Sequence, residues 1–190
     1  LREIYNRSSV SHVKIILSQE SLKDAHVYCV LNNIGAQQYG PLIEKYIISK
    51  FSMTKNNASN CTGDCTYNEH NIEIKASLGG KLFSKFNFVQ IRLSQKIDFY
   101  LCTAYYLSNE NIDDEGELFV FKVPKENMKT LIIKYGGYAH GTISVNGKIT
   151  FESVEKNENT KVEYALRPTY NDKCWISLLE YRVSEHNPMS

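Results

Sequence analysis

The spacing of apolar residues changes once along this chain, and that change limits the fold more than any other feature. Before residue 52, apolar side chains recur every three or four positions, which is the period of a helix. After residue 64 they alternate with polar residues or form short runs rich in Tyr, Phe and Ile, which indicates strands. A chain of 190 residues supports one sizeable core. We therefore predict a single domain, residues 1–190, with a mixed α/β (α+β) architecture.

Capping and turn residues divide the chain further. Helices are predicted over 18–34, which opens with Ser and Glu caps and ends near Gly35, and over 39–51, where Pro41 occupies the first turn. The polar residues 54–63 predict a loop. Later elements are strands at 64–67, 72–77, 86–93, 97–107, 118–123 and 174–183, a helix from Pro124 to Ile133, and a hairpin around Asn146-Gly147.

Composition excludes several classes of protein. Lys and Arg total 22 against 21 Asp and Glu, so a uniformly basic surface is excluded and any nucleic-acid site must be a local patch. No apolar run reaches the roughly 18 residues of a membrane helix, and the first residues lack a signal-peptide pattern, which predicts a soluble intracellular protein. Five scattered cysteines predict free thiols. Cys61 and Cys65 are spaced as two zinc ligands, but no second pair matches them, which disfavours zinc.

One polar constellation carries chemistry: Asp64, eight residues, then Glu73-Ile74-Lys75. Residues two apart in a strand leave the same face, so Glu73 and Lys75 point together. Asp64 joins them only if the hairpin register allows it. With a four-residue loop at 68–71, we expect Asp64 to lie opposite Lys75, whereas a loop of three or five residues would turn it to the other face.

This trio suits phosphodiester hydrolysis. Two carboxylates, from Asp64 and Glu73, provide the hard oxygen ligands of Mg²⁺, which polarises a phosphoryl oxygen and lowers the pKa of a bound water. Lys75 would orient that water, act as a base or stabilise charge in the transition state. Glu44, on the second helix, is a candidate third acidic ligand. It is equally well explained as a solvated helical residue beside Lys45.

The order of helix, polar loop, Asp64, Glu73-Ile-Lys75, Phe88-Val-Gln-Ile-Arg92 and an aromatic strand at 97–107 resembles the αβββαβ core of the PD-(D/E)xK nucleases, specifically type II restriction endonucleases. The likeness spans about residues 35–107, with a looser one at 123–132. It implies a restriction-endonuclease-like fold, in which a mixed central sheet is flanked by helices. It also implies a cut in double-stranded DNA that needs one or two Mg²⁺ per site, made by a homodimer in the cytoplasm of a prokaryotic cell. Residues 108–190 would then carry the DNA-reading loops.

The family's functional residues map onto this chain one by one. Asp64, Glu73 and Lys75 match the catalytic signature, Glu44 matches the first-helix acid, and Gln90 falls where several members have a further active-site polar residue. The residue before Asp64 is Gly63, where the family motif has proline. Asp98 is an alternative to Asp64 as the catalytic aspartate. Its position beside a buried strand instead indicates a structural role.

Candidate DNA contacts follow from position and charge. Gln90 and Arg92 are expected on one strand face, where arginine suits a bidentate phosphate contact, although an exposed polar face explains them as well. The segment Lys134–Thr142, rich in glycine, is the candidate base-reading loop, with a plain turn as the alternative. The full set of candidates is Ser77, Arg92, Lys134, Tyr138, His140, Lys148 and Arg167.

Two other functions remain open. A repair or structure-specific nuclease, including a Holliday-junction enzyme, would need the same Asp64, Glu73 and Lys75. A catalytically inactive DNA-binding module would keep the fold and lose the chemistry. A cysteine hydrolase is disfavoured, because no cysteine sits in a recognisable nucleophile motif and the histidines are dispersed.

Overall fold

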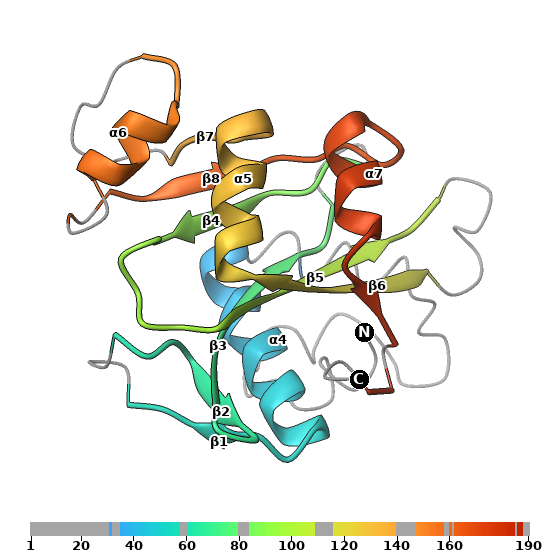
Figure 1. The fold of residues 1–190 in the computed structure, drawn as a ribbon. Coiled ribbons are helices and arrows are strands. Elements are labelled where there is room, and N and C mark those ends of the chain that lie inside the picture. Colours follow the sequence, from blue (N-terminus) through green and yellow to red (C-terminus); the bar gives the residue numbers. More distant parts are fainter. Residues whose placement is uncertain are drawn as a thin grey trace.

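The computed structural model describes residues 31, 35–57, 61–79, 84–108, 116–139, 147–157, 160, 162–184, 186 and 187 (Figure 1). These ranges form a mixed α+β fold with four helices, a six-stranded mixed sheet and a three-stranded antiparallel sheet. The predicted fold class is therefore confirmed. The helix expected over 18–34 lies outside the described residues, apart from the buried Leu31.

Helix α4 (Ala36–Lys50) is the predicted second helix, and it begins three residues earlier than expected. Pro41 lies in its second turn, and Tyr39, Ile43 and Ile47 form its buried face. These apolar residues recur every four positions, so they follow one side of the helix. That side packs on the central sheet.

The central sheet has the strand order β1 (Thr54–Lys55), β2 (Cys65–Tyr67), β3 (His70–Ser77), β5 (Phe99–Tyr106), β6 (Glu117–Pro124) and β9 (Arg182–Val183). Strands β3 and β5 pair in parallel, and every other neighbouring pair is antiparallel. β5 is buried along nearly its whole length, as expected of a central strand. A parallel pair requires a crossover, and residues 78–98 provide it.

The two faces of this sheet carry different layers. On one face, Ile72 and Ile74 of β3 and Leu101 of β5 pack in a cluster with α4. On the other, Tyr100 joins a second cluster with the buried Trp175. This second layer contains α5 (Lys125–Tyr135), α7 (Lys173–Leu179) and the small sheet of β4 (Phe88–Ile91), β8 (Tyr164–Leu166) and β7 (Gly137–Tyr138) (Figure 1). Because side chains alternate along a strand, Glu73 and Lys75 point toward the second layer.

The C-terminal part departs from the sequence prediction. The strand expected over 174–183 is wrong: residues 173–179 form α7, and only β9 remains extended. Asp172 caps this helix, because its Oδ1 accepts a hydrogen bond from the Trp175 N–H at 2.7 Å. Asn146 of the expected hairpin lies outside the described residues. After Gly147 the chain enters α6 (Phe151–Lys156) through a Thr150 capping box rather than a strand.

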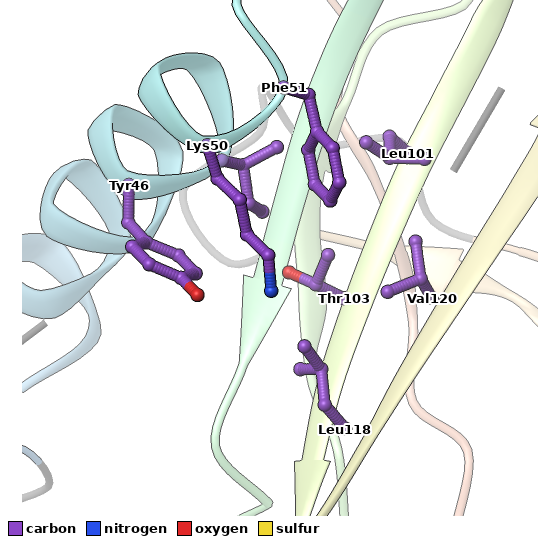
Figure 2. Close-up of a pocket in the computed structure, with 8 residues that line it drawn as sticks. Tyr46, Lys50, Phe51, Leu101, Thr103, Leu118 and Val120 are labelled. Carbon is purple, nitrogen blue, oxygen red and sulfur yellow. The ribbon is translucent and has the colours of Figure 1, made fainter. Parts of the chain in front are cut away.

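A small apolar hollow lies between the C-terminal half of α4 and strands β5 and β6 (Figure 2). Lys50 lies across it, with its Nζ 5.5 Å from the ring centre of Tyr46 and 5.7 Å from that of Phe51. The hollow is on the α4 face of the sheet, away from the face to which Glu73 and Lys75 point. It is therefore separate from Glu73 and Lys75, neither of which lines it. No helix in the described ranges is both long and apolar enough to cross a membrane.

Candidate active site

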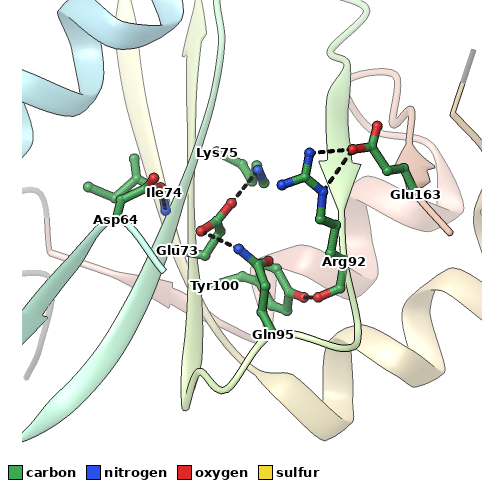
Figure 3. Close-up of polar contacts among 8 residues, drawn as sticks. All are labelled: Asp64, Glu73, Ile74, Lys75, Arg92, Gln95, Tyr100 and Glu163. Atoms are coloured by element: carbon green, nitrogen blue, oxygen red, sulfur yellow. Dashed lines mark hydrogen bonds and ion pairs between the residues drawn. The ribbon is translucent and has the colours of Figure 1, made fainter. Parts of the chain in front are cut away.

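The β2–β3 hairpin closes through a two-residue turn. Asn68 and Glu69 both have positive φ, 47° and 68°, as a type I′ turn requires. Tyr67 pairs with His70 and Cys65 with Ile72, so the expected four-residue loop is wrong. This register differs from the expected one by two positions, so Asp64 does not lie opposite Lys75. The ladder ends at Cys65, and the Asp64 side chain turns to the backbone of β3, beside Ile74 (Figure 3).

Gly63 directs the chain into this arrangement. Its φ is +78°, and a Cβ built on it would lie 2.5 Å from the Ile72 carbonyl oxygen and 2.9 Å from Cγ2 of Ile97. Only glycine adopts this conformation freely, whereas proline is fixed near −65°. Proline, which precedes the aspartate in the PD-(D/E)xK motif, could therefore not replace Gly63 in this backbone.

Asp64 sits where the regular ladder ends. Its backbone N–H donates to the Ile72 carbonyl at 2.9 Å, and its carboxylate Oδ2 accepts the N–H of Ile74 at 2.7 Å. The pKa of Asp64 is raised from 3.8 to about 7, first by burial and next by the charge of Glu73. The charge of Glu44 contributes to this rise, whereas the N–H of Ile74 and the charge of Lys75 oppose it. Asp64 therefore lies within the electrostatic reach of both acids and of the lysine.

Glu73 is the best-held acid of the site. Its Oε1 accepts the ammonium of Lys75 at 2.6 Å, and its Oε2 accepts the side-chain amide of Gln95 at 2.9 Å (Figure 3). The side chains of Glu73 and Lys75 are only 8% and 12% exposed. Tyr100 of β5 is the neighbour of Glu73 in the pairing of β3 with β5. Its pKa is raised, first by burial and then by the charge of Glu73. A buried ion pair of this kind is stable only when its remaining polar atoms are also bonded.

Glu44 belongs to the opposite layer. Its carboxylate pairs with Lys55 of β1 at 3.2 Å, and its side chain is 23% exposed. The charge of Glu44 still contributes to the raised pKa of Asp64. The pKa of Asp64 is therefore raised by one acid from β3 and by one from α4. The assignment of Glu44 as a third metal ligand remains a proposal.

The acidic side chains near β3 provide oxygen donors of the kind that Mg²⁺ prefers. Within the described ranges, no group of three or more His, Cys, Asp or Glu side chains is arranged to hold a metal ion. The two carboxylates of Asp64 and Glu73 are nevertheless a fitting set, because Mg²⁺ is commonly bound by one or two carboxylates and keeps waters and substrate oxygens as its other ligands. Zinc is not favoured, since Cys65 is buried against Met53 while Cys61 is exposed.

Gln90 and Arg92 do not share a strand face as expected. β4 is irregular between Phe88 and Ile91, and Gln90 is exposed with a φ of 56°. Because a bulge interrupts the alternation of side chains, the two-residue rule fails here. Arg92 lies just beyond β4, and its guanidinium donates to Glu163 through Nε at 2.8 Å and through Nη2. Figure 3 shows this guanidinium on the Lys75 side of the site.

Gln95 was missed by sequence reasoning. It is a polar residue in the loop that joins β4 to β5, and it contacts Glu73 only because the crossover returns beside β3. No local pattern marks it, since the contact spans 22 residues. The signal available in the sequence was only its place a few residues before the buried strand at 97–107.

The predicted DNA contacts have different surroundings. Ser77 is only 3% exposed, and its Oγ accepts the backbone N–H of Asn87 at 3.0 Å, so its hydroxyl is turned to the interior. His140 lies outside the described residues. The others lie near the small sheet and its helices: Tyr138 is half-buried and stacks on Tyr164, while Lys134 at the end of α5, Lys148 before α6 and Arg167 after β8 are exposed.

Asp98 serves the architecture. Its Oδ2 accepts the backbone N–H of Asn71 at 2.8 Å and lies 3.7 Å from Nδ1 of His70. These contacts join the start of β5 to the start of β3. Asp98 therefore has the structural role expected of it.

Neither a model of a known protein family nor the sequence of a curated protein matches this chain. A functional assignment consequently depends on the geometry of the hairpin and on the motif it displays.

Proposed function

We propose that this chain is a Mg²⁺-dependent endonuclease that hydrolyses phosphodiester bonds in specific sequences of double-stranded DNA, in the manner of the type II restriction endonucleases of the PD-(D/E)xK superfamily. One observation carries the proposal. The β2–β3 hairpin places Asp64, with its pKa raised to about 7, within electrostatic reach of the buried Glu73–Lys75 pair. A carboxylate with raised proton affinity, near a second carboxylate and its ammonium partner, forms a centre suited to a divalent cation and a phosphate.

The residues divide the work by their chemistry. Asp64 and Glu73 would hold Mg²⁺, which supplies Lewis acidity at the phosphate and lowers the pKa of water. Lys75 places its ammonium next to Glu73, where it can orient a water and stabilise negative charge on the phosphate oxygens. One water is consumed per bond: its oxygen joins phosphorus, a phosphorus–oxygen bond of the backbone breaks, and the departing oxygen takes up a proton.

The small sheet supports the DNA-binding half of the proposal. Arg92 follows β4, and Arg167 follows β8, the strand next to β4 in the small sheet. Arginine forms two parallel hydrogen bonds to a phosphate, so Arg92 is suited to position the scissile strand. A homodimer, with one centre for each DNA strand, is the assembly that the family resemblance implies.

The direct test is cleavage. The protein is incubated with supercoiled plasmid and with phage DNA in Mg²⁺, with chelator added to a parallel sample, and the ends of all fragments are sequenced. We expect fragments with a constant end sequence, abolished by the chelator and by Glu73→Gln. The matched control is Glu155→Gln, at an exposed glutamate of α6, which should cut like the unsubstituted protein.

The outcomes separate the candidate functions. Ends that gather at nicks, branches or junctions, with no sequence in common, would favour a structure-specific nuclease. A folded protein that binds duplex DNA and cuts none of it in Mg²⁺ or Mn²⁺ would favour an inactive module. If Glu73→Gln cuts DNA as fast as the unsubstituted protein, the proposed active centre is refuted.

A further inference from the structure

The loop from Arg92 to Asp98 is held by several hydrogen bonds to other elements of the fold. Both of its ends and its middle are tied to other elements. The contacts are Tyr100 Oη to the Arg92 carbonyl at 2.9 Å, Lys125 Nζ to the Gln95 carbonyl at 2.7 Å, the Lys96 N–H to the Cys61 carbonyl at 2.7 Å, and the Asp98 N–H to the Asn71 carbonyl at 2.9 Å. These bonds fix the position from which Gln95 reaches β3 (Figure 3).

Only one end of the Gln95 side-chain amide forms a hydrogen bond within the described residues. Its Nε2 donates to Oε2 of Glu73 at 2.9 Å, while its Oε1 is buried and has no hydrogen-bond partner among the described residues. Exchanging the two ends of the amide would direct Oε1 at a carboxylate oxygen, which is repulsive, so the contact with Glu73 fixes the orientation. A buried acceptor left without a donor is costly, and such groups in native proteins are usually completed by water or ligand.

We infer that Gln95 belongs to the active centre: its Nε2 positions Glu73, and its Oε1 accepts a hydrogen bond from the water that attacks the phosphate. The inference rests on the proposed nuclease function for the role of that water. Lys75 holds the other oxygen of Glu73. Glu73 is therefore oriented from both sides, by an ammonium group on its own strand and by an amide that arrives through the crossover.

If Gln95 had only a structural role, every substitution at this position would weaken cation binding. The proposed role predicts opposite signs for cation binding. Gln95→Met removes the donor that orients Glu73, and loss of such an orienting bond typically weakens metal binding or activity by about 10-fold to 100-fold. Gln95→Glu replaces the donor with a third carboxylate beside Glu73, which should strengthen cation binding.

The experiment measures Mn²⁺ binding by calorimetry and DNA cleavage by steady-state kinetics. We expect Gln95→Met to weaken Mn²⁺ binding about 10-fold and to lower kcat about 10-fold to 100-fold, with KM for DNA changed less than about twofold. Gln95→Glu should bind Mn²⁺ more tightly than the unsubstituted protein and still show a lowered kcat. The matched control is Gln38→Met, at an exposed glutamine of α4.

Failure of this inference and failure of the proposed function give different results. If the unsubstituted protein binds Mn²⁺ and cuts DNA while both Gln95 variants stay within twofold of it in Mn²⁺ affinity and kcat, the role of Gln95 is refuted and the nuclease stands. A loss of Mn²⁺ affinity in both variants also refutes it, because that is the pattern of a structural defect. If the unsubstituted protein cuts nothing, the nuclease proposal fails, and opposite shifts in Mn²⁺ affinity would still support Gln95 as the residue that positions Glu73.

Discussion

The β2–β3 hairpin and the small sheet each pair a cation with a glutamate, in very different surroundings. The Lys75 and Glu73 side chains are 12% and 8% exposed, whereas those of Arg92 and Glu163 are 45% and 20% exposed. A pair taken out of water is held in one geometry, because breaking it leaves a buried charge. A partly solvated pair is weak and easily exchanged for another partner. If the proposed function holds, the hairpin pair would suit chemistry at a fixed point, and the solvated pair would suit contacts that change when DNA binds.

The largest effect expected from this comparison is on turnover. Lys75→Met keeps most of the apolar stem and removes the ammonium beside Glu73, so we expect kcat to fall about 10³-fold or more while the Kd for DNA changes less than about threefold. Single-turnover cleavage and a binding assay in Ca²⁺ measure the two quantities. The control is Lys45→Met, at an exposed lysine of α4. A kcat within tenfold of the unsubstituted protein would contradict the role of Lys75.

The second prediction concerns stability and pH. The pKa of Asp64 is about 7 in the folded chain against 3.8 ordinarily, so the folded state holds this proton where the unfolded state has lost it. The protonated carboxyl thus favours folding at low pH, and that contribution is lost as pH rises from about 4 to about 7. Each unit of pKa shift corresponds to about 1.4 kcal/mol, so the loss is a few kcal/mol.

Asp64→Asn keeps an oxygen for the N–H of Ile74 and cannot ionise. Without added cation we expect this variant to be more stable than the unsubstituted protein at pH 8, to lack most of the decline between pH 4 and 7, and to cut no DNA. Urea unfolding at several pH values measures this. Parallel stability curves for the two proteins would show that Asp64 does not carry the raised pKa.

A smaller effect is expected at the solvated pair. Arg92→Ala should weaken DNA binding about threefold to tenfold and reduce the dependence of log K on log salt by about 0.9, the value for one phosphate contact. Glu163→Gln frees the guanidinium and should strengthen binding slightly. The control is Arg182→Ala, because Arg182 makes a similar exposed pair with Glu117 at the β6–β9 edge. Loss of affinity in both arginine variants would point to general charge rather than to a site.

The smallest effect is expected at Gln90. Its φ of 56° is unfavourable for a residue with a side chain, so Gln90→Gly should stabilise the fold by about 1 kcal/mol or less. Because the side chain is exposed, we expect kcat to change less than about threefold. Thermal unfolding and cleavage rates measure the two effects. A large loss of kcat in this variant would restore Gln90 to the centre and weaken the case for Gln95.

The parts of the site that depend on local geometry were predictable. Glu73 and Lys75 point together because alternate residues of a strand share a face, and no distant contact alters that. The turn at Asn68-Glu69 was harder to predict, since it lacks the glycine typical of two-residue hairpins and was assigned to a longer loop. Gln95 could not be found from the sequence, because its contact with Glu73 depends on how the crossover returns.

The fold shows the same division between local and distant causes. The strand at 97–107 and the helix after Pro124 were predicted from their own residues. Residues 174–183 are predicted as a strand, yet Asp172 is a helix-capping residue and residues 173–179 form α7. Gln90 and Arg92 were placed on one face because the bulge in β4 leaves no mark in the sequence.

The backbone at Gly63 makes this position intolerant of substitution. A residue with a side chain here would press against the carbonyl of Ile72, and proline would require the opposite sign of φ. Any replacement would therefore have to move the entry of β2 relative to β3, and the carboxylate of Asp64 would move with it.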